Sequence, residues 1–237
     1  MKTLTIIPSR LSSTRLPGKP LLKIKGLSII SHVFKRAEEA NIGEVIVAAE
    51  DQEIVDDILK NGGRAILTSK NHKTGTDRIY EALQKLKITG VDLIMNLQGD
   101  EPEIDITDII NLNKKMIFNE AKLGTLAAKI NDTKDFKNQN IVKVITKKTL
   151  NKDTFSEAKI FTRNISYVDN VYHHIGIYCY SVDTLEKFTN LNQTKNEIEN
   201  RLEQLRALDN DITINVALAN SSPIGVDTKE DFVALKK

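Results

Sequence analysis

Apolar residues along the chain follow two patterns, short runs rich in β-branched residues and longer stretches with helical spacing. The runs predict strands over Thr3–Ile7, Val45–Ala49, Arg64–Leu67, Val91–Leu97, Leu123–Ala128, Ile141–Ile145, Ile175–Tyr180 and Ile212–Leu218. The helical spacing predicts helices over Ile29–Ala40, Gln52–Asn61, Thr76–Lys87, Ile106–Asn119 and Glu197–Leu208. Strands and helices alternate through the N-terminal part, which predicts an α/β protein with a largely parallel sheet covered on both faces.

Two polar stretches, Asn131–Asn140 and Thr146–Ser156, lack any such period and predict surface loops or an excursion inserted into the sheet. No linker rich in Pro, Gly or Ser, no repeat and no low-complexity tract divides the chain. We therefore expect a single domain over residues 1–237.

Composition narrows the class of protein. Hydrophobic residues make up 40% of the 237 residues and charged residues 28%, which is typical of a globular protein and excludes a disordered or fibrous chain. A net charge of +2 favours neither nucleic acid nor a membrane surface as a partner. Cys179 is the single cysteine, so neither an internal disulfide nor a zinc cluster is expected, and we expect it to be a buried thiol. The apolar runs are too short for a signal peptide or a membrane helix, which favours a cytoplasmic location.

The first predicted strand opens into a loop that carries Arg10, Arg15, Lys19 and a run of hydroxyl residues. Backbone N–H groups in such a loop can surround phosphate oxygens, while Arg15 and Lys19 can neutralise a triphosphate. A plain solvated basic loop is the alternative. The loop contains neither the G-x-G-x-x-G fingerprint nor the G-x-x-x-x-G-K-[ST] phosphate loop, which argues against a nicotinamide-dependent oxidoreductase.

Two aspartates are candidate magnesium ligands. Asp100 follows an apolar strand and Gly99, where the backbone can approach a ligand closely, and Asp227 follows Gly225 in a turn after the last strand. Mg²⁺ prefers one or two carboxylates together with phosphate oxygens and water. Each aspartate could instead be a turn or capping residue, and Asp227 could cap a final helix.

Several segments in addition to the loop resemble nucleotidyltransferases of the glycosyltransferase-A-like fold, and most closely the family of 3-deoxy-manno-octulosonate (Kdo) cytidylyltransferases. They are Thr74–Arg78, Asn96–Pro102, Asn140–Val144, His174–Tyr178, Leu202–Leu208 and Gly225–Thr228. The resemblance implies a three-layer, mostly parallel mixed sheet of the nucleotide-diphospho-sugar transferase fold. It also implies an enzyme that uses CTP and Mg²⁺ to convert Kdo into CMP-Kdo and pyrophosphate for lipopolysaccharide synthesis, and that forms a homodimer.

The same resemblance assigns roles to residues of this chain. Catalysis is assigned to Arg15, Lys19, Asp100 and Asp227, of which Asp100 and Asp227 would hold the metal. Nucleotide binding is assigned to Pro8, Ser9, Arg10, Ser13, Thr14, Arg15, Lys19, Thr74, Gly75, Thr76, Arg78, Gln98 and Asp100. Sugar binding is assigned to Gln98, Arg163, His174, Tyr178, Glu203 and Gln204.

Simpler structural roles remain open for some of these residues. Thr74 or Thr76 could cap the helix that follows, His174 could be a structural histidine, and Tyr178, like Tyr180, could be a core residue. The chain departs from the family pattern after Arg163, because a second basic residue is missing and the loop is short. The alternatives are therefore the same reaction on a variant acid, such as 8-amino-Kdo or another 2-keto-3-deoxy sugar acid, or a catalytically silent nucleotide-binding protein.

Overall fold

A computed structural model describes residues 1–12, 16–165, 168–222, 225–226 and 228–236. The chain forms two compact units. The first contains Met1–Ile110 and Pro223–Lys237, and the second contains Asn111–Ser222. The boundary falls within one helix, and the single domain expected from the sequence stays a prediction. In the described part of the chain, no helix is long and apolar enough to cross a membrane.

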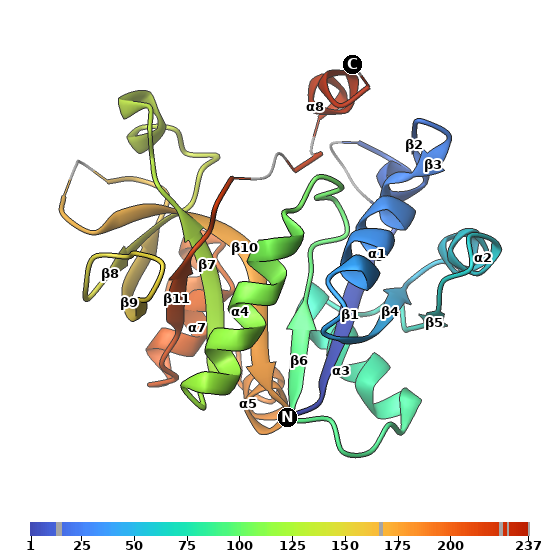
Figure 1. The fold of residues 1–237 in the computed structure, drawn as a ribbon, viewed down its shortest axis with the longest axis horizontal. Helices are drawn as coiled ribbons and strands as arrows, with labels where there is room; N and C mark the ends of the chain where they lie inside the picture. Colours follow the sequence, from blue (N-terminus) through green and yellow to red (C-terminus); the bar gives the residue numbers. More distant parts are fainter. Residues whose placement is uncertain (13–15, 166–167, 223–224, 227, 237) are drawn as a thin grey trace. The chain divides into compact units, whose positions relative to one another are not determined.

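The first unit is built on parallel strands in the order β5-β4-β1-β6. Their bounds are β1 Thr3–Ser9, β4 Gly43–Ala49, β5 Ala65–Leu67 and β6 Leu93–Asn96, and a small hairpin is formed by β2 Lys23–Ile24 and β3 Leu27–Ser28. Six of the seven β1 residues are buried, so both faces of this strand are covered. The prediction of a parallel, doubly covered sheet is confirmed for this unit (Figure 1).

Three helices connect these strands, α1 Ile29–Glu39, α2 Gln52–Lys60 and α3 Gly75–Leu86. Helix α4 Ile106–Phe118 follows β6, α8 Lys229–Ala234 lies near the end of the chain, and a short 3₁₀ turn, η1, covers Lys19–Leu21. Thr74 caps α3, because its hydroxyl accepts a hydrogen bond from the Asp77 amide. Thr228 caps α8, since its hydroxyl accepts from the Asp231 amide in a capping box.

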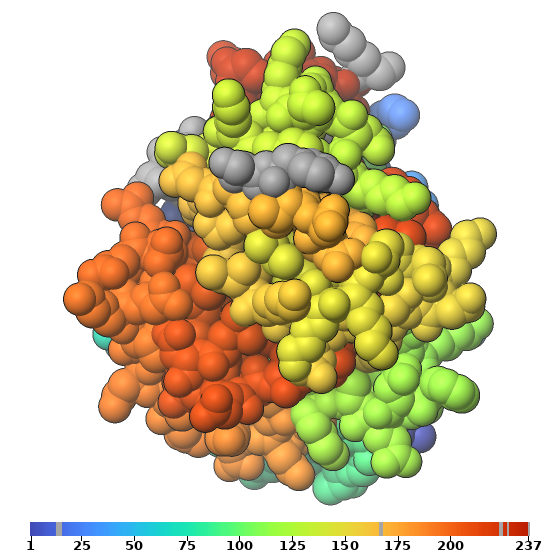
Figure 2. Space-filling model, turned by 90° about the vertical axis from the view of Figure 1, so that its left-hand side faces the viewer, coloured from blue at the N-terminus to red at the C-terminus, as the bar shows by residue number. Residues whose placement is uncertain are grey.

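Five strands of mixed direction form the second unit, in the order β10-β7-β11-β9-β8, with β8 also paired to β10. Their bounds are β7 Leu123–Ala128, β8 Lys143–Thr146, β9 Phe155–Thr162, β10 Val171–Ser181 and β11 Asn215–Leu218. The helical elements are η2 Thr133–Phe136, α5 Val182–Thr189, α6 Lys195–Asn200 and α7 Gln204–Asp209. The yellow segment that carries β9 lies beside the orange-red segment of α7 in Figure 2.

The structure corrects several predicted boundaries in the second unit. Strand β9 and helix α5 were not predicted, and β10 begins four residues before the predicted strand. The helix predicted over Glu197–Leu208 is two helices, because Arg201 adopts a left-handed conformation with φ of 53° and ends α6. A buried ion pair between Glu197 and Arg206, with Nη2 to Oε1 at 2.6 Å, ties the two pieces together.

Cys179 is buried, as expected, and has no disulfide partner. Burial raises the pKa of its thiol, so it is held in the neutral form.

Candidate functional site

A cavity of about 360 Å³ lies in the first unit, at the end of β1 and over the start of α3. Nine of the predicted nucleotide-binding residues line it: Pro8, Ser9, Arg10, Lys19, Thr74, Gly75, Arg78, Gln98 and Asp100. Parallel strands deliver their carboxyl ends to one edge, which is why residues that follow β1 and β6 meet here. Ser13, Thr14, Arg15 and Asp227 lie outside the described residues, and Thr76 is buried without lining the cavity.

The loop after β1 is anchored by the residues that follow β4. The Asp51 carboxylate accepts a hydrogen bond from the Leu11 amide at 2.8 Å, and Glu50 accepts one from the Ser12 hydroxyl at 3.4 Å. The Gly18 amide donates to the Leu11 carbonyl, which brings the two described ends of the loop together. Gly18 itself has a left-handed φ of 67°, a conformation that favours glycine.

Two charged groups meet across the cavity. The Lys19 ammonium lies 2.6 Å from Asp100 Oδ2, and the two side chains are 12% and 31% exposed. Gly99 packs closely on β1, because a Cβ at that position would lie 3.0 Å from the Pro8 carbonyl oxygen. The close approach of the Gln98–Asp100 turn explains why glycine precedes this aspartate.

Asp100 also contacts the C-terminal segment of the same unit. The Val226 amide donates to the Asp100 carbonyl at 2.9 Å, and Val226 is the residue before Asp227 in the sequence. Val226 is fully buried with Ile24 and Ile29, and the partly buried Phe232 and Leu235 of the C-terminal segment pack on the same cluster. These contacts explain how positions so distant in sequence belong to one unit.

The buried hydroxyl of Ser9 has no hydrogen-bond partner among the described residues, and Ser9 lines the cavity. A buried polar group without a partner costs free energy, so a ligand oxygen in the cavity would satisfy it. The cavity thus combines an unsatisfied hydroxyl, cationic side chains and a carboxylate, a donor set that suits a phosphorylated ligand with a hard cation.

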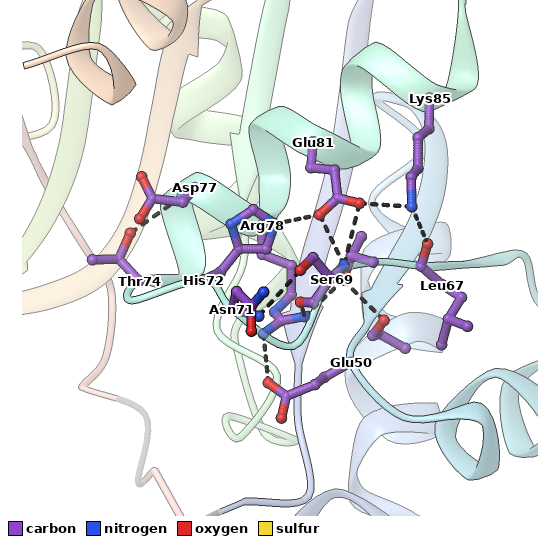
Figure 3. Close-up of polar contacts among 12 residues, drawn as sticks. Glu50, Leu67, Ser69, Asn71, His72, Thr74, Asp77, Arg78, Glu81 and Lys85 are labelled. Carbon is purple, nitrogen blue, oxygen red and sulfur yellow. Dashed lines mark hydrogen bonds and ion pairs between the residues drawn. The ribbon is translucent and has the colours of Figure 1, made fainter.

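Arg78 has a structural role in addition to lining the cavity. Its guanidinium donates to Glu50 Oε2 at 2.6 Å, to the Thr68 hydroxyl at 2.7 Å and to the Ser69 carbonyl at 3.0 Å (Figure 3). Both members of the Arg78–Glu50 ion pair are buried. The pair therefore joins α3 to the end of β4 beneath the cavity.

The sequence also missed residues of this site. His72 and Lys73 line the cavity directly before Thr74, and Glu81 holds the segment that carries them. The sequence signal that could have identified them is the basic pair that His72 and Lys73 form directly before the Thr74–Arg78 motif. Nothing in the sequence pattern indicates that Glu81 reaches back to that pair.

The predicted sugar-binding residues other than Gln98 lie in the second unit. The His174 and Tyr178 rings are 5.4 Å apart on β10, and His174 Nε2 lies 3.0 Å from the Thr125 hydroxyl. Glu203 precedes α7, whose first residue is Gln204, and the Arg163 guanidinium donates to the Gln139 carbonyl at 3.1 Å. His174 and Tyr180 are buried, whereas Tyr178 is partly exposed.

Burial shifts the pKa values of His174 and Tyr178. Desolvation, with a smaller contribution from His173, lowers the pKa of His174 to about 3. Desolvation, then Tyr180 and Glu203, raises the pKa of Tyr178 well above its usual value. His174 and Tyr178 are therefore both neutral near pH 7, and they offer hydrogen bonds and not charge.

The chain is similar in sequence to known proteins. The model of the cytidylyltransferase family matches residues 4–214. The chain is 41% identical over 239 residues to a 3-deoxy-manno-octulosonate cytidylyltransferase of Rhodopseudomonas palustris (strain BisB18), a match that covers 100% of this chain and 97% of the relative. The protein of that name from Thermodesulfovibrio yellowstonii is 42% identical over 249 residues, covering 100% and 98%.

Solved structures agree with this result. A CMP:2-keto-3-deoxy-manno-octonic acid synthetase complexed with CTP superimposes with a TM-score of 0.90 at 34% identity, covering 100% of this chain and 97% of that one. A UDP-glucose pyrophosphorylase complexed with UDP-glucose reaches a TM-score of 0.73 at 14% identity, covering 100% and 97%, and so shares the fold. The expected mixed-sheet fold of nucleotide-diphospho-sugar transferases is confirmed.

Proposed function

Because the chain belongs to the cytidylyltransferase family, among the 3-deoxy-manno-octulosonate cytidylyltransferases, we propose that its first unit binds CTP and that its second unit supplies the groups that recognise Kdo. The chain is a nucleotidyltransferase that activates Kdo with CTP and yields CMP-Kdo and pyrophosphate. The observation that carries the residue assignment is the cavity in which Ser9, Arg10, Lys19 and Asp100 meet.

The transfer itself needs orientation and charge neutralisation more than covalent chemistry from the protein. The anomeric hydroxyl of Kdo attacks the α-phosphorus of CTP, its proton is released, and the bond to the pyrophosphate oxygen breaks. Arg10 and Lys19 at the cavity stabilise the negative charge on the phosphates, and Arg15 is assigned the same task from its sequence position. Ser9 donates its hydroxyl to a ligand oxygen.

Magnesium fits the residues of the first unit. Asp100 supplies a partly exposed carboxylate at the cavity, and Asp227, which follows the Val226 that bonds to Asp100, would supply the second one. Hard carboxylate oxygens together with phosphate are the ligands that Mg²⁺ prefers. The ion would supply charge neutralisation on the phosphates.

For the sugar acid, Arg163 offers the planar donor pair that suits a carboxylate. Tyr178, Gln204 and Glu203 offer neutral and acidic groups for hydroxyls, and His174 offers a neutral imidazole. The short segment after Arg163 favours one second candidate, the same transfer to a variant acid, which is 8-amino-Kdo or another 2-keto-3-deoxy sugar acid. Competition between Kdo and the variant acid for the purified enzyme distinguishes them.

We place the reaction in the supply of Kdo for lipopolysaccharide and expect a cytoplasmic homodimer. The named relatives support the link to Kdo. Light scattering at several protein concentrations tests the dimer.

Pyrophosphate release from CTP, Mg²⁺ and Kdo tests the function, with ATP, GTP and UTP in parallel. Pyrophosphate release that occurs with CTP but not with ATP, GTP or UTP, and that is lost in Asp100→Ala, supports the function and the metal site together. Absence of CTP binding to the wild-type protein contradicts both.

A further inference from the structure

The segment between β5 and α3, residues 68–74, forms one wall of the cavity. His72, Lys73 and Thr74 line the cavity, while Thr68 is buried and its amide and hydroxyl both donate to the Ala49 carbonyl, at 2.8 and 2.9 Å. Thr74 is fixed at the other end as the cap of α3. The contacts that hold the middle of this segment therefore determine the shape of the cavity.

Glu81 of α3 holds that middle part. Its two carboxylate oxygens accept from the Ser69 amide at 3.2 and 2.9 Å, and the carboxylate also contacts His72 Nε2 and the Lys85 ammonium (Figure 3). Glu81 itself does not line the cavity. One carboxylate outside the cavity lining therefore fixes both the backbone of the wall and the His72 imidazole that lines the cavity.

The electrostatics of Glu81 agree with this arrangement. Burial alone would raise the pKa of its carboxyl, but hydrogen bonds from Lys85, His72 and the Ser69 amide outweigh burial and lower the pKa to about 2. The carboxylate stays charged over the working range of an enzyme, and its bonds to His72 and Ser69 are charge-assisted. Such bonds hold a side chain in one orientation more firmly than neutral ones do.

The helix places its side chains so that they act together. Arg78 and Glu81 are three residues apart on α3 and so project from the same face. Arg78 bonds to the Thr68 hydroxyl and to the Ser69 carbonyl, while Glu81 bonds to the Ser69 amide and to His72. The peptide groups on both sides of Ser69 are thereby fixed to the helix.

We infer that Glu81 is a positioning residue for CTP, and that it acts by holding the His72 imidazole and the Ser69 backbone so that His72 becomes a direct nucleotide contact. The inference rests on the proposed CTP site and adds two residues to it. An imidazole fixed by a carboxylate on one nitrogen presents its remaining face and nitrogen in a single orientation. Lys73 adds a cation beside it, which suits the phosphates of the same ligand.

The test is isothermal titration of the full chain with CTP and MgCl₂ in the absence of Kdo, followed by steady-state kinetics. Glu81→Ala and His72→Ala each raise the Kd for CTP about 10-fold, which is the effect of one lost charge-assisted hydrogen bond. The kcat of Glu81→Ala at saturating CTP stays within about twofold, because Glu81 does not line the cavity and leaves the reacting groups untouched.

The double variant distinguishes action through His72 from general damage. If Glu81 works by holding His72, the Kd of the double variant is close to that of either single variant, whereas independent effects multiply to about 100-fold. Glu81→Gln keeps one oxygen for the Ser69 amide, so it recovers part of the affinity. Should Glu81→Ala fail to fold, His72→Ala and Glu81→Gln carry the test.

Lys85→Met is the matched control, because Lys85 contacts the same carboxylate but does not line the cavity. Its Kd for CTP stays within about twofold of the wild-type value. An unchanged Kd in folded Glu81→Ala, or multiplied effects in the double variant, overturns the inference while the proposed function stands. A wild-type protein that does not bind CTP overturns the proposed function itself.

Discussion

The ammonium of Lys19 and the carboxylate of Asp100 form an ion pair at 2.6 Å, although the sequence assigns one to phosphate and the other to a metal. Binding of a phosphate or of a cation would weaken this ion pair. A phosphate competes with Asp100 for the lysine, and a cation competes with Lys19 for the carboxylate. The pair keeps both side chains extended into the cavity and oriented toward each other.

Asp100→Asn should separate nucleotide binding from the effect of magnesium. We expect Mg²⁺ to tighten CTP binding in the wild-type protein and to have no effect in the variant, because the amide keeps the size but removes the charge. The rate of pyrophosphate release should fall about 10²- to 10³-fold, since a metal contributes several kcal/mol to such a transfer. Calorimetry with and without MgCl₂ measures the first effect.

Asp92→Asn is the control for that experiment, since Asp92 accepts from the Lys2 amide and does not line the cavity. Its CTP affinity should keep the magnesium dependence of the wild-type protein. Equal magnesium dependence in Asp100→Asn would exclude Asp100 as a ligand.

Removing the carboxylate of Glu50 should destabilise the protein strongly. Glu50→Ala leaves the buried Arg78 guanidinium without its charged partner, and breaking a buried pair costs about 3–5 kcal/mol of unfolding free energy. Urea unfolding measures the loss. Glu44→Ala, which breaks the exposed Arg64–Glu44 pair, is the matched control and should change stability little. Similar losses in the two variants would contradict the structural role of the Arg78–Glu50 pair.

His174 should make the protein less stable as the pH falls below neutrality. Its pKa is about 3 in the folded state, against 6.5 for the unfolded chain, so between these values the unfolded state binds one more proton. The unfolding free energy should therefore decrease with falling pH, by up to about 1.4 kcal/mol per pH unit from this group. His174→Gln should have a shallower slope in urea unfolding between pH 7 and pH 5. An identical slope in both proteins would show that the histidine is not buried in its neutral form.

Tyr178→Phe should weaken the binding of the sugar acid and leave the nucleotide unaffected. Losing one hydroxyl contact is expected to raise the KM for Kdo about 10-fold, while the KM for CTP stays within about twofold. Initial rates at varied Kdo and varied CTP separate the two constants. Tyr180→Phe is the control, because Tyr180 is buried and has no assigned role in the site. A change in the KM for CTP instead would assign Tyr178 to nucleotide binding.

The first unit could be predicted from the sequence, and the reason is its regular βα alternation. Predicted and observed bounds of α1, α2 and β4 agree within two residues, because each has an unbroken apolar period. The residues that line the cavity could also be predicted, since parallel strands place the residues after β1 and β6 at one edge.

The second unit was less predictable, because its strands are mixed in direction and partly exposed. Strand β9 begins inside a stretch rich in Lys, Asp and Thr, and three of its eight residues are buried, so its apolar signal is weak. The break at Arg201 could not be predicted, because a left-handed arginine is stabilised by tertiary contacts such as the Glu197–Arg206 pair. Contacts such as Glu81 with His72 depend in the same way on which loop packs against a helix.

The contact between the Val226 amide and the Asp100 carbonyl has a consequence for the order in which the protein is made. On the ribosome, residues 111–222 emerge before the segment that carries Val226, so the second unit has the time to fold while the first still lacks a part. The cluster of Ile24, Ile29 and Val226 in the first unit can therefore be completed only after this returning segment has been synthesised.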